Sequence, residues 1–394
     1  MLREIVENDQ AAATGRIVAL DRARTFTTLL VIVHHSVVNY TYFGNGDRMR
    51  WLGFDLVVLF NDSFFMAFMF LVSGLFVHDS LARRGAVGYL CHRAWRLGVP
   101  LLISIFVLIP LAYYASFLRY HLPGTTDFNF FHFWWHTLTI GPWPSGQSWF
   151  LWVLLMFDAI AAAIWSMAPR ILRAFGLLVF ALRDHPVTAF VAFLIVSIVA
   201  YLPMHLAFGD GSWLEPGRYP FPIQTSRVLL YPTYFFTGVG IGVVILRAGI
   251  LAENGEIAKR WVIWLALAVL FYVAILLLVY AHHNWIADFA SPPLPWKMAY
   301  GLAFAMFSVA MAFTVLAASL RLTQTSLRLL DAMQPSAYGI YLLHYVFIIW
   351  LQYAVYDPPF PAVAKFAIVF AGTLSMSWVL TVLLRKVPPL ARMI

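Results

Sequence analysis

The sequence predicts an all-α integral membrane protein, built as a single bundle of about ten transmembrane helices. Of the 394 residues, 62% are hydrophobic and 11% are charged, whereas a soluble domain is about half apolar and about a quarter charged. The apolar residues gather in runs of about 20, the length that a helix needs to cross a hydrocarbon core roughly 30 Å thick. Transmembrane β-strands would be about half as long and would alternate in character, so the runs predict helices.

Ten such runs follow one another along the chain. The first comes after a polar segment of mixed charge, and no small-residue cleavage site follows it, so we expect a permanent span rather than a signal peptide. In the sixth run, the spacing of Gly238 and Gly242 predicts a close contact between two helices. We expect a cytoplasmic segment at 1–24, a membrane domain at 25–384 and a cytoplasmic tail at 385–394. The expected spans are 25–43, 55–76, 97–118, 149–167, 187–206, 229–247, 261–280, 298–320, 337–353 and 363–384.

The distribution of basic residues predicts the orientation of the bundle. Most of the 26 Lys and Arg residues lie before the first span or in every second connection after it, and the positive-inside rule assigns those segments to the cytosol. Both termini are therefore predicted to be cytoplasmic. The net charge of +8 then reflects membrane topology, and we expect no nucleic-acid partner. The single cysteine, Cys91, excludes an intrachain disulfide.

The connections predicted to lie outside the cytosol are long and aromatic. Residues 119–148, 207–228 and 281–297 combine Trp, His, Gly and Pro with several polar side chains. Aromatic residues at this level commonly form an interfacial belt, which is the favoured interpretation. Loops of this composition also present stacking surfaces and hydrogen bonds to sugars, and that alternative stays open.

The first span carries an arginine and a histidine on one face. Arg24 and His35 are eleven positions apart, which at 100° per residue is three turns and about 20°, so they are about 16 Å apart along the axis. His35 would lie near the middle of the bilayer, where an ionisable group is costly and usually faces a pocket or a partner. His35 is therefore a candidate functional residue. The alternative is a neutral ring that donates to a backbone carbonyl, and this is the favoured interpretation for His34.

Other ionisable side chains are expected at a similar depth. Asp62 in the second span should lie level with His35, Asp158 falls near the middle of the fourth span, and His344 lies in the ninth. Two carboxylates and several histidines near one plane predict a polar chamber. Either aspartate could hold His35 in one tautomer and support its protonated form.

Two arginines one turn apart, Arg93 and Arg96, precede the third expected span. Membrane topology explains their charge but not their pairing. Forked guanidinium groups bind phosphate through charge-assisted hydrogen bonds, so the pair also suits an anion site. We predict no metal site, because His132 and His136, which could share a helix face, have no apparent third ligand.

Several ordered motifs resemble those of the acyltransferase family 3 membrane proteins. The match begins with a Leu-Asp-x-x-Arg start and an arginine followed after ten residues by a histidine, which selects Arg24 and His35 a second time. The resemblance spans about residues 21–350 and looks closest to the branch that includes glucan-biosynthesis protein C, which is associated with succinylating periplasmic glucans. Relatives often have a histidine before the Trp-Phe-Leu element, where this chain has Ser148, so any role of that histidine is absent or relocated. The stretches that carry the resemblance are LDRARTFTTLLVIVHHS, FMAFMFLVSGLF, CHRAWRLGVPLL, SWFLWVLLMFD, YFFTGVGIG and SAYGIYLLH.

The resemblance implies an enzyme that moves an acyl group, acetyl or succinyl, from cytosolic acyl-coenzyme A to a hydroxyl of a carbohydrate or glucan outside the cytoplasm. It implies a bacterial inner membrane and His35 as the general base, with an acyl-imidazole on His35 as a second route. Tyr338, Tyr341 or Ser73 could donate to the oxyanion. The further catalytic candidates are Asp62, Asp158, Tyr341 and His344, and the donor-binding candidates are Arg24, Arg93, Arg96 and Ser73.

A proton-coupled transporter or exporter is the main alternative, because midplane His and Asp residues can relay protons. Transporters often contain inverted repeats with paired Gly/Pro interruptions, and no such pairing is visible in this sequence. Arg93 and Arg96 also have no evident function in a proton relay. A catalytically inactive relative that acts as a sensor is a third interpretation.

Overall fold

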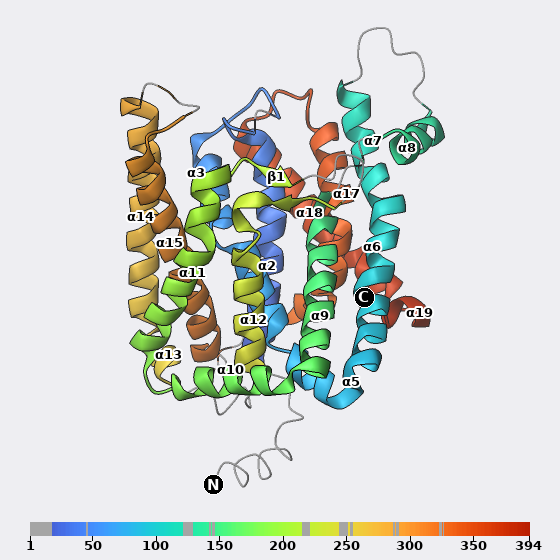
Figure 1. Ribbon diagram of the computed structural model, residues 1–394. Coiled ribbons are helices and arrows are strands. Elements are labelled where there is room, and N and C mark those ends of the chain that lie inside the picture. The colour runs from blue at the N-terminus through green and yellow to red at the C-terminus, as the bar shows by residue number, and fades with distance from the viewer. Residues whose placement is uncertain are drawn as a thin grey trace.

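The structure is a bundle of long helices with a two-stranded hairpin at one end (Figure 1). This computed structural model describes residues 18–394 apart from 45, 121–128, 142, 144–145, 215–220, 244–250, 253–254, 287, 289–290, 323–324 and 326. The apolar runs form helices because a helix pairs its own backbone N–H and C=O groups, as hydrocarbon requires of any spanning segment. The all-α prediction is confirmed.

Eight helical stretches in the described part of the chain are long and apolar enough to cross a membrane. They coincide with eight of the ten expected spans. The other two fall on α2 (Val18–Val37), whose first turns carry Asp21, Arg22 and Arg24, and on α12 (Leu230–Val243), with 14 described residues. The count of ten stays a prediction. The eight stretches are Leu52–Gly74, Val77–Arg119, Gly146–Met167, Pro186–Phe208, Trp261–Trp285, Leu294–Arg321, Arg328–Ala354 and Ala362–Leu384.

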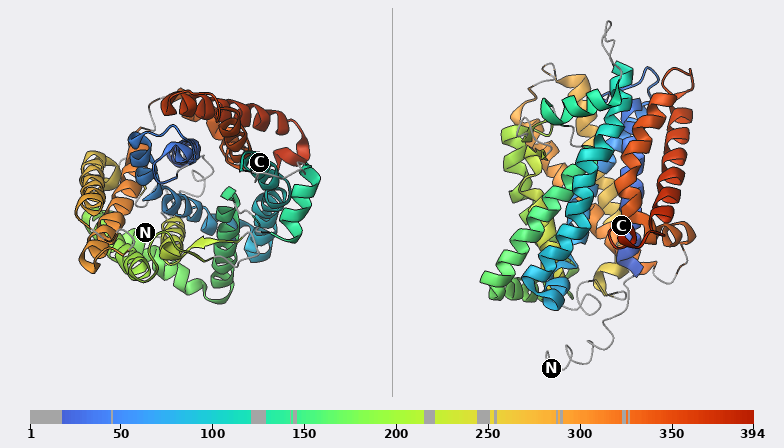
Figure 2. Two further views of the ribbon diagram at one scale, coloured as in Figure 1. Left: turned by 90° about the horizontal axis from the view of Figure 1, so that it is seen from above. Right: turned by 90° about the vertical axis from the view of Figure 1, so that its right-hand side faces the viewer.

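Helix α2, where the first span is expected, lies inside the bundle. It packs against α15 (Leu294–Arg321), α17 (Ala337–Ala354) and α18 (Ala362–Leu384). Seen from above, it lies between α15 with its neighbour α14 (Trp261–Trp285) on one side and α17 with α18 on the other (Figure 2). Side chains on α2 therefore face other helices on several sides, which suits a helix that carries polar residues through a membrane protein.

The second span consists of two helices rather than one. α3 (Leu52–Asp62) ends at Asp62, and α4 (Phe65–Gly74) begins three residues later, because Phe64 leaves the helical conformation with φ −147° and ψ −33°. Neither glycine nor proline stands at this break, so composition alone did not reveal it. Asp62 consequently lies at a helix end and not within a continuous helix.

The helical stretch that contains the third expected span begins at Val77, well before residue 97. α5 (Val77–Arg93), α6 (Val99–Ile103) and α7 (Ile109–Tyr120) are joined by π-turns at 94–98 and 104–108. A proline follows each π-turn two residues later, and proline lacks the N–H that would continue a regular α-helix. At Gly85, φ is +67°, and α5 bends sharply there at no steric cost.

The connections gather at two ends of the bundle, as the alternation of basic segments predicts. At one end lie α13 (Glu256–Lys259) and α10 (Pro169–Ala181), which runs roughly perpendicular to the long helices (Figure 1). α2 begins at this end, which we call the α2 end. At the opposite end lie α8 (Phe130–Thr139) and the hairpin of β1 (Trp213–Leu214) and β2 (Ile223–Gln224) (Figure 1). Short helices such as α8 and α10 were not predicted, since they lie within connections.

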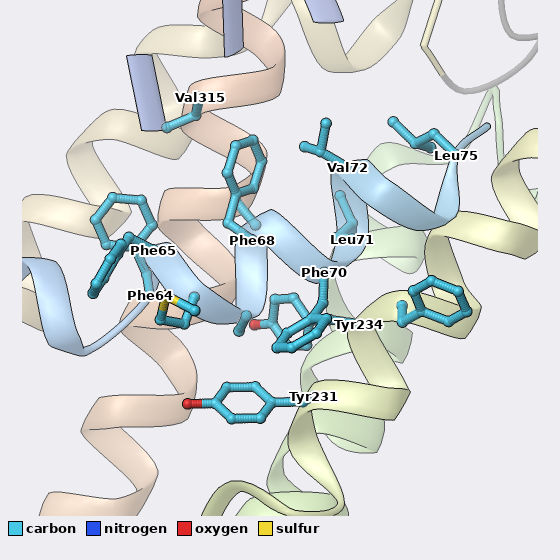
Figure 3. Packing of buried hydrophobic residues seen from close by; sticks show 14 of the residues in the cluster. Phe64, Phe65, Phe68, Phe70, Leu71, Val72, Leu75, Tyr231, Tyr234 and Val315 are labelled. Atoms are coloured by element: carbon cyan, nitrogen blue, oxygen red, sulfur yellow. The ribbon is translucent and has the colours of Figure 1, made fainter. Parts of the chain in front are cut away.

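Aromatic side chains of α4 and α12 contribute much of the main hydrophobic core (Figure 3). The ring centroids of Phe70 on α4 and Tyr231 on α12 are 4.9 Å apart. The two helices approach closely, because a Cβ atom at Gly238 would lie 2.1 Å from the carbonyl oxygen of Leu71, and one at Gly242 would lie 2.2 Å from that of Leu75. The close helix contact predicted at these glycines is confirmed.

A buried ion pair fastens the end of the bundle opposite the α2 end. Lys365 Nζ lies 2.9 Å from Asp47 Oδ2, and these side chains are 1% and 2% exposed. The same ammonium group donates to the carbonyl oxygen of Tyr356 at 2.8 Å. The pair joins the loop before α3 to α18, so it connects the first and last thirds of the chain.

We expect Asp47→Ala to destabilise the fold by about 3–5 kcal/mol, because it leaves the Lys365 ammonium buried without a counter-charge. The double variant Asp47→Asn with Lys365→Met should lose less, since no unpaired charge remains. Thermal denaturation of the purified protein in a neutral detergent measures both. If the Asp47→Ala protein had the same melting temperature as the unaltered protein, the ion pair would add little to stability.

Candidate active site

A cavity of about 760 Å³ lies at the α2 end of the bundle. Its size is within the range usual for small-molecule sites. The helices α2, α4, α5, α9 (Trp149–Met167) and α17 contribute to its wall, as does the chain after α18. Of the predicted site residues, the structure brings five together here, namely Arg24, Ser73, Arg93, Arg96 and Tyr341.

The cavity is strongly basic. Asp21 contributes a single carboxylate to the described lining. The guanidinium groups of Arg24, Arg96 and Arg392 form no hydrogen bond or ion pair with the residues that the structure describes, although the guanidinium carbon of Arg24 lies 4.1 Å from the centroid of the Phe76 ring. These unpaired cations can bind an anion. The five arginines that line the cavity are Arg24, Arg93, Arg96, Arg385 and Arg392.

Polar residues of α2 continue the lining inward from Arg24. Thr25, Thr27 and Thr28 face the cavity, although their hydroxyls donate to backbone carbonyls one turn earlier, at 2.5 Å for Thr27 and 3.1 Å for Thr28. This arrangement lets a helix turn short polar side chains towards a cavity without leaving a buried donor unpaired.

Arg93 is held in place by a buried carboxylate. Its Nε lies 3.1 Å from Asp158 Oδ2 and donates to the hydroxyl of Tyr89 at 3.1 Å. Tyr89 in turn donates to Asp158 Oδ1, and the Asp158 side chain is fully buried. Asp158 therefore pairs with Arg93 and does not contact His35, which corrects the hypothesis that it orients this histidine.

Asp62 also lies apart from His35. Its carboxylate accepts from Arg227 Nη2 at 2.6 Å, and its backbone carbonyl accepts from Nη1 at 2.9 Å. Arg227 is buried in the 3₁₀ turn Thr225–Arg227 after the hairpin. Asp62 therefore pairs with Arg227 and not with His35, which corrects the hypothesis that it orients this histidine.

Aromatic rings, and not carboxylates, surround His35. Its ring centroid lies 5.3 Å from that of His34, 5.5 Å from that of His344 and 5.3 Å from that of Tyr345. The His35 side chain is only partly buried, whereas His344 is fully buried. Two histidines from α2 and one from α17 therefore meet inside the bundle, which agrees with the predicted polar layer but not with its predicted composition.

The tautomer of His344 follows from its hydrogen bond. His344 Nδ1 lies 2.5 Å from the carbonyl oxygen of Tyr341, and a carbonyl oxygen can only accept, so Nδ1 carries the proton. His344 Nε2 is buried without a partner in the described structure. In the neutral ring, Nε2 therefore keeps an unused lone pair close to His35.

His35 lies beyond the deep end of the cavity rather than in its wall. Thr28 lines the cavity and precedes His35 by seven residues, which is about 10 Å along the helix. On α17, Tyr341 lines the cavity, and its ring centroid lies 5.8 Å from that of His344. The layer of histidines is thus the next layer of side chains above the cavity.

The three hydroxyls considered as oxyanion donors differ in their bonding. Tyr338 donates to the carbonyl oxygen of Arg96 at 2.7 Å, and Tyr341 donates to that of Gln147 at 2.8 Å. Ser73 lines the cavity and forms no hydrogen bond with the described residues. Of the three protons, that of Ser73 is free to reach a ligand.

A second polar cluster lies at the end of α11 (Pro186–Phe208), near the hairpin. Asp210 accepts from Tyr201 at 2.9 Å and lies 3.1 Å from His205 Nδ1. Burial disfavours the charged form of Asp210, but the hydrogen bond with His205 and the charge of Arg227 outweigh it, so the pKa of this carboxyl is below its ordinary value. Asp210 is therefore an anion bound by two side chains of α11, and its backbone carbonyl accepts from Gln224 of β2 at 2.6 Å.

Several residues of the site were not predicted. Arg385 and Arg392 were interpreted only as topological charges, and nothing in their spacing indicated a cavity. Tyr89 precedes Arg93 by four residues, or about one helical turn, and this spacing could have suggested a contact between their side chains. Ser148, where relatives often carry histidine, donates to Ser104 at 2.6 Å within the bundle.

Comparison with known families identifies the chain. A family model described as an acyltransferase domain, that of acyltransferase family 3, matches residues 17–382. No curated protein matches the chain. The matched region contains α2, the histidine layer and most of the cavity wall, and it ends before Arg385 and Arg392. The protein is a membrane acyltransferase, and the chain belongs to acyltransferase family 3.

Proposed function

We propose that this enzyme transfers an acyl group from acyl-coenzyme A to a hydroxyl of a carbohydrate outside the cytoplasm, with His35 as the general base. The observation that carries the proposal is the basic cavity directly below the histidine layer. The donor would enter the cavity from the cytosol, and the acceptor would approach His35 from the opposite end of the bundle. Acetyl and succinyl groups both suit this scheme, and so does a glucan acceptor at a bacterial inner membrane.

The basic cavity supports a donor with several phosphate groups. Coenzyme A carries a diphosphate and a 3′-phosphate, and guanidinium groups bind phosphate through paired, charge-assisted hydrogen bonds. The guanidinium groups of Arg24 and Arg96 form no hydrogen bond or ion pair with the described residues, so both are available to such a ligand. Arg93 is oriented by Asp158, which gives the site one arginine in a fixed position.

The neutral deep end of the cavity supports the position of the thioester. Thr28, Met69, Phe150 and Tyr341 line this part, and none of them is charged. The uncharged pantetheine arm of the donor would lie along these side chains and carry the thioester toward His35. The phosphates would stay with the arginines.

The chemistry then requires one proton transfer in each direction. His35 takes the proton of the acceptor hydroxyl, and the hydroxyl oxygen attacks the thioester carbonyl carbon. Ser73 is the available side-chain donor to the resulting oxyanion. The tetrahedral intermediate breaks its C–S bond, and the thiolate takes the proton from His35, so the products are the ester and free coenzyme A.

His35→Ala should lower acyl transfer by about 10²–10⁴-fold, the usual contribution of a general base. The matched control is His34→Ala, one position away on α2, which should have a much smaller effect because the proposal gives His34 no proton to carry. Mass spectrometry of envelope glycans from cells that express each variant measures the transfer. Normal product levels with His35→Ala, at equal amounts of inserted protein, would remove His35 from the mechanism.

Arg96→Ala should weaken binding of acetyl-coenzyme A by about 1–3 kcal/mol, the range for a charge-assisted contact. Arg24→Ala and Arg93→Ala should act in the same direction. Arg328→Ala is the matched control, since Arg328 is exposed at the α2 end and does not line the cavity. Isothermal titration of the purified protein measures the affinity, and equal affinities for the Arg96 and Arg328 variants would contradict a donor site in this cavity.

The proposal also requires the α2 end to face the cytosol. A reporter protein that is active only in the cytosol, fused after Ile394, should therefore be active, because the chain after α18 lines the cavity at the α2 end. A reporter that is active only outside the cytosol should be inactive in the same position. The reverse result would place the basic cavity on the wrong side of the membrane for a cytosolic donor.

A further inference from the structure

The last ten residues of the chain are part of the cavity wall. α18 ends at Leu384, the chain turns, and the short helix α19 (Pro388–Ala391) follows. Met393 is buried, and Ile394 packs against the main hydrophobic core. Arg385, Arg392 and Ile394 all line the cavity. The segment expected to be a cytoplasmic tail is therefore folded against the bundle.

The two arginines of this segment differ in what they contact. Arg385 donates through Nη1 to the carbonyl oxygen of Pro335, next to the start of α17, so it ties the segment to the bundle. The Arg392 guanidinium is exposed to the cavity and forms no ion pair or hydrogen bond with the described residues. Arg385 is thus in a position to hold the segment, and Arg392 is free to bind a ligand.

Like charges that share a cavity repel one another unless an anion lies between them. Arg392 adds a further cation to a lining that already contains Arg24 and Arg96, neither of which forms an ion pair with the described residues. A ligand with several negative charges would offset this repulsion, and a ligand with one charge would offset it less. The arrangement therefore favours a polyanion that is contacted from two sides, by α2 and the π-turn at 94–98 on one side and by the C-terminal segment on the other.

We propose that the C-terminal segment completes the donor site, with Arg392 binding a phosphate group of the acyl donor and Arg385 positioning the segment. The identity of the donor as acyl-coenzyme A rests on the proposed function. The role of Arg392 does not rest on the family match, because that match ends at residue 382. The phosphate of an anionic lipid has the same chemistry, so the experiment must separate the two sources.

The test measures the affinity of coenzyme A for the purified full-length protein in a neutral detergent. Arg392→Ala should weaken this affinity about tenfold or more, because a charge-assisted hydrogen bond is lost. Arg392→Lys should recover part of the loss, since the charge remains. The matched control is Lys386→Ala, which removes an exposed cation of the same segment that does not line the cavity, and it should leave the affinity unchanged.

A second measurement excludes a merely structural effect. The melting temperature of the Arg392→Ala protein without ligand should equal that of the unaltered protein, while the rise in melting temperature caused by coenzyme A should be smaller. Nanodiscs with and without phosphatidylglycerol provide the lipid arm. The proposal would be overturned if phosphatidylglycerol raised the melting temperature of the unaltered protein but not that of the Arg392→Ala protein, while both proteins bound coenzyme A with equal affinity.

The outcomes separate this inference from the proposed function. If Arg96→Ala weakens the affinity for coenzyme A and Arg392→Ala does not, the proposed donor site is supported, but the C-terminal segment lines the cavity without binding the donor. If the unaltered protein does not bind coenzyme A, the proposed donor itself is wrong. If both variants lose affinity and Lys386→Ala does not, the segment belongs to the donor site.

Discussion

The structure of the site depends on positive charge that the protein does not neutralise by itself. Five arginines line one cavity, and the described lining offers them the single carboxylate of Asp21. Of the five, Arg93 has a carboxylate partner in Asp158, which is fully buried and cannot serve a second cation. In a membrane protein, such an excess is costly unless the cations face water or an anionic ligand. The cavity provides that access, and it explains why these side chains converge at one end of the bundle.

Helix α17 connects this charged cavity with the histidine layer. Tyr338, Tyr341 and His344 follow one another at intervals of three residues, so they lie along one face of the helix. Tyr338 donates to the backbone carbonyl of Arg96 in the π-turn at 94–98, and Tyr341 to that of Gln147, just before α9. His344 is bonded to Tyr341 in its own helix. These bonds to two other parts of the bundle hold α17 in place and so fix the position of His344 relative to the cavity.

The sequence predicted the spans well because hydropathy depends only on local composition. It also predicted Arg24 and His35 on one face of one helix, since helical geometry alone decides this. The sequence did not predict which residues, distant along the chain, would pair with each buried side chain. Asp62 and Asp158 lie at plausible depths, but both pair with arginines, and the choice of Arg227 and Arg93 is set by how separate helices pack. No periodicity in a single sequence contains that information.

The C-terminal segment is a second case in which local composition did not reveal a packing contact. A short basic stretch after the last apolar run has the composition of a cytoplasmic tail, and its arginines satisfy the positive-inside rule without any contact. The burial of Met393, the packing of Ile394 and the hydrogen bond from Arg385 to Pro335 show that the stretch is folded against the bundle. A charge that follows a topological rule can therefore also line a cavity.

Because α2 is a continuous helix, it holds Arg24 and His35 at a fixed separation. Arg24 and His35 belong to one uninterrupted helix, so their separation of about 16 Å along the axis cannot change without bending it. A donor whose phosphates are held near Arg24 would thus present its reactive group at a fixed height, provided that the part between is extended and uncharged. The lining between these two levels comes from threonines, Met69 and Tyr341, which suit such an arm. Binding of the donor phosphates by the arginines would then position the thioester, although the arginines do not contact it.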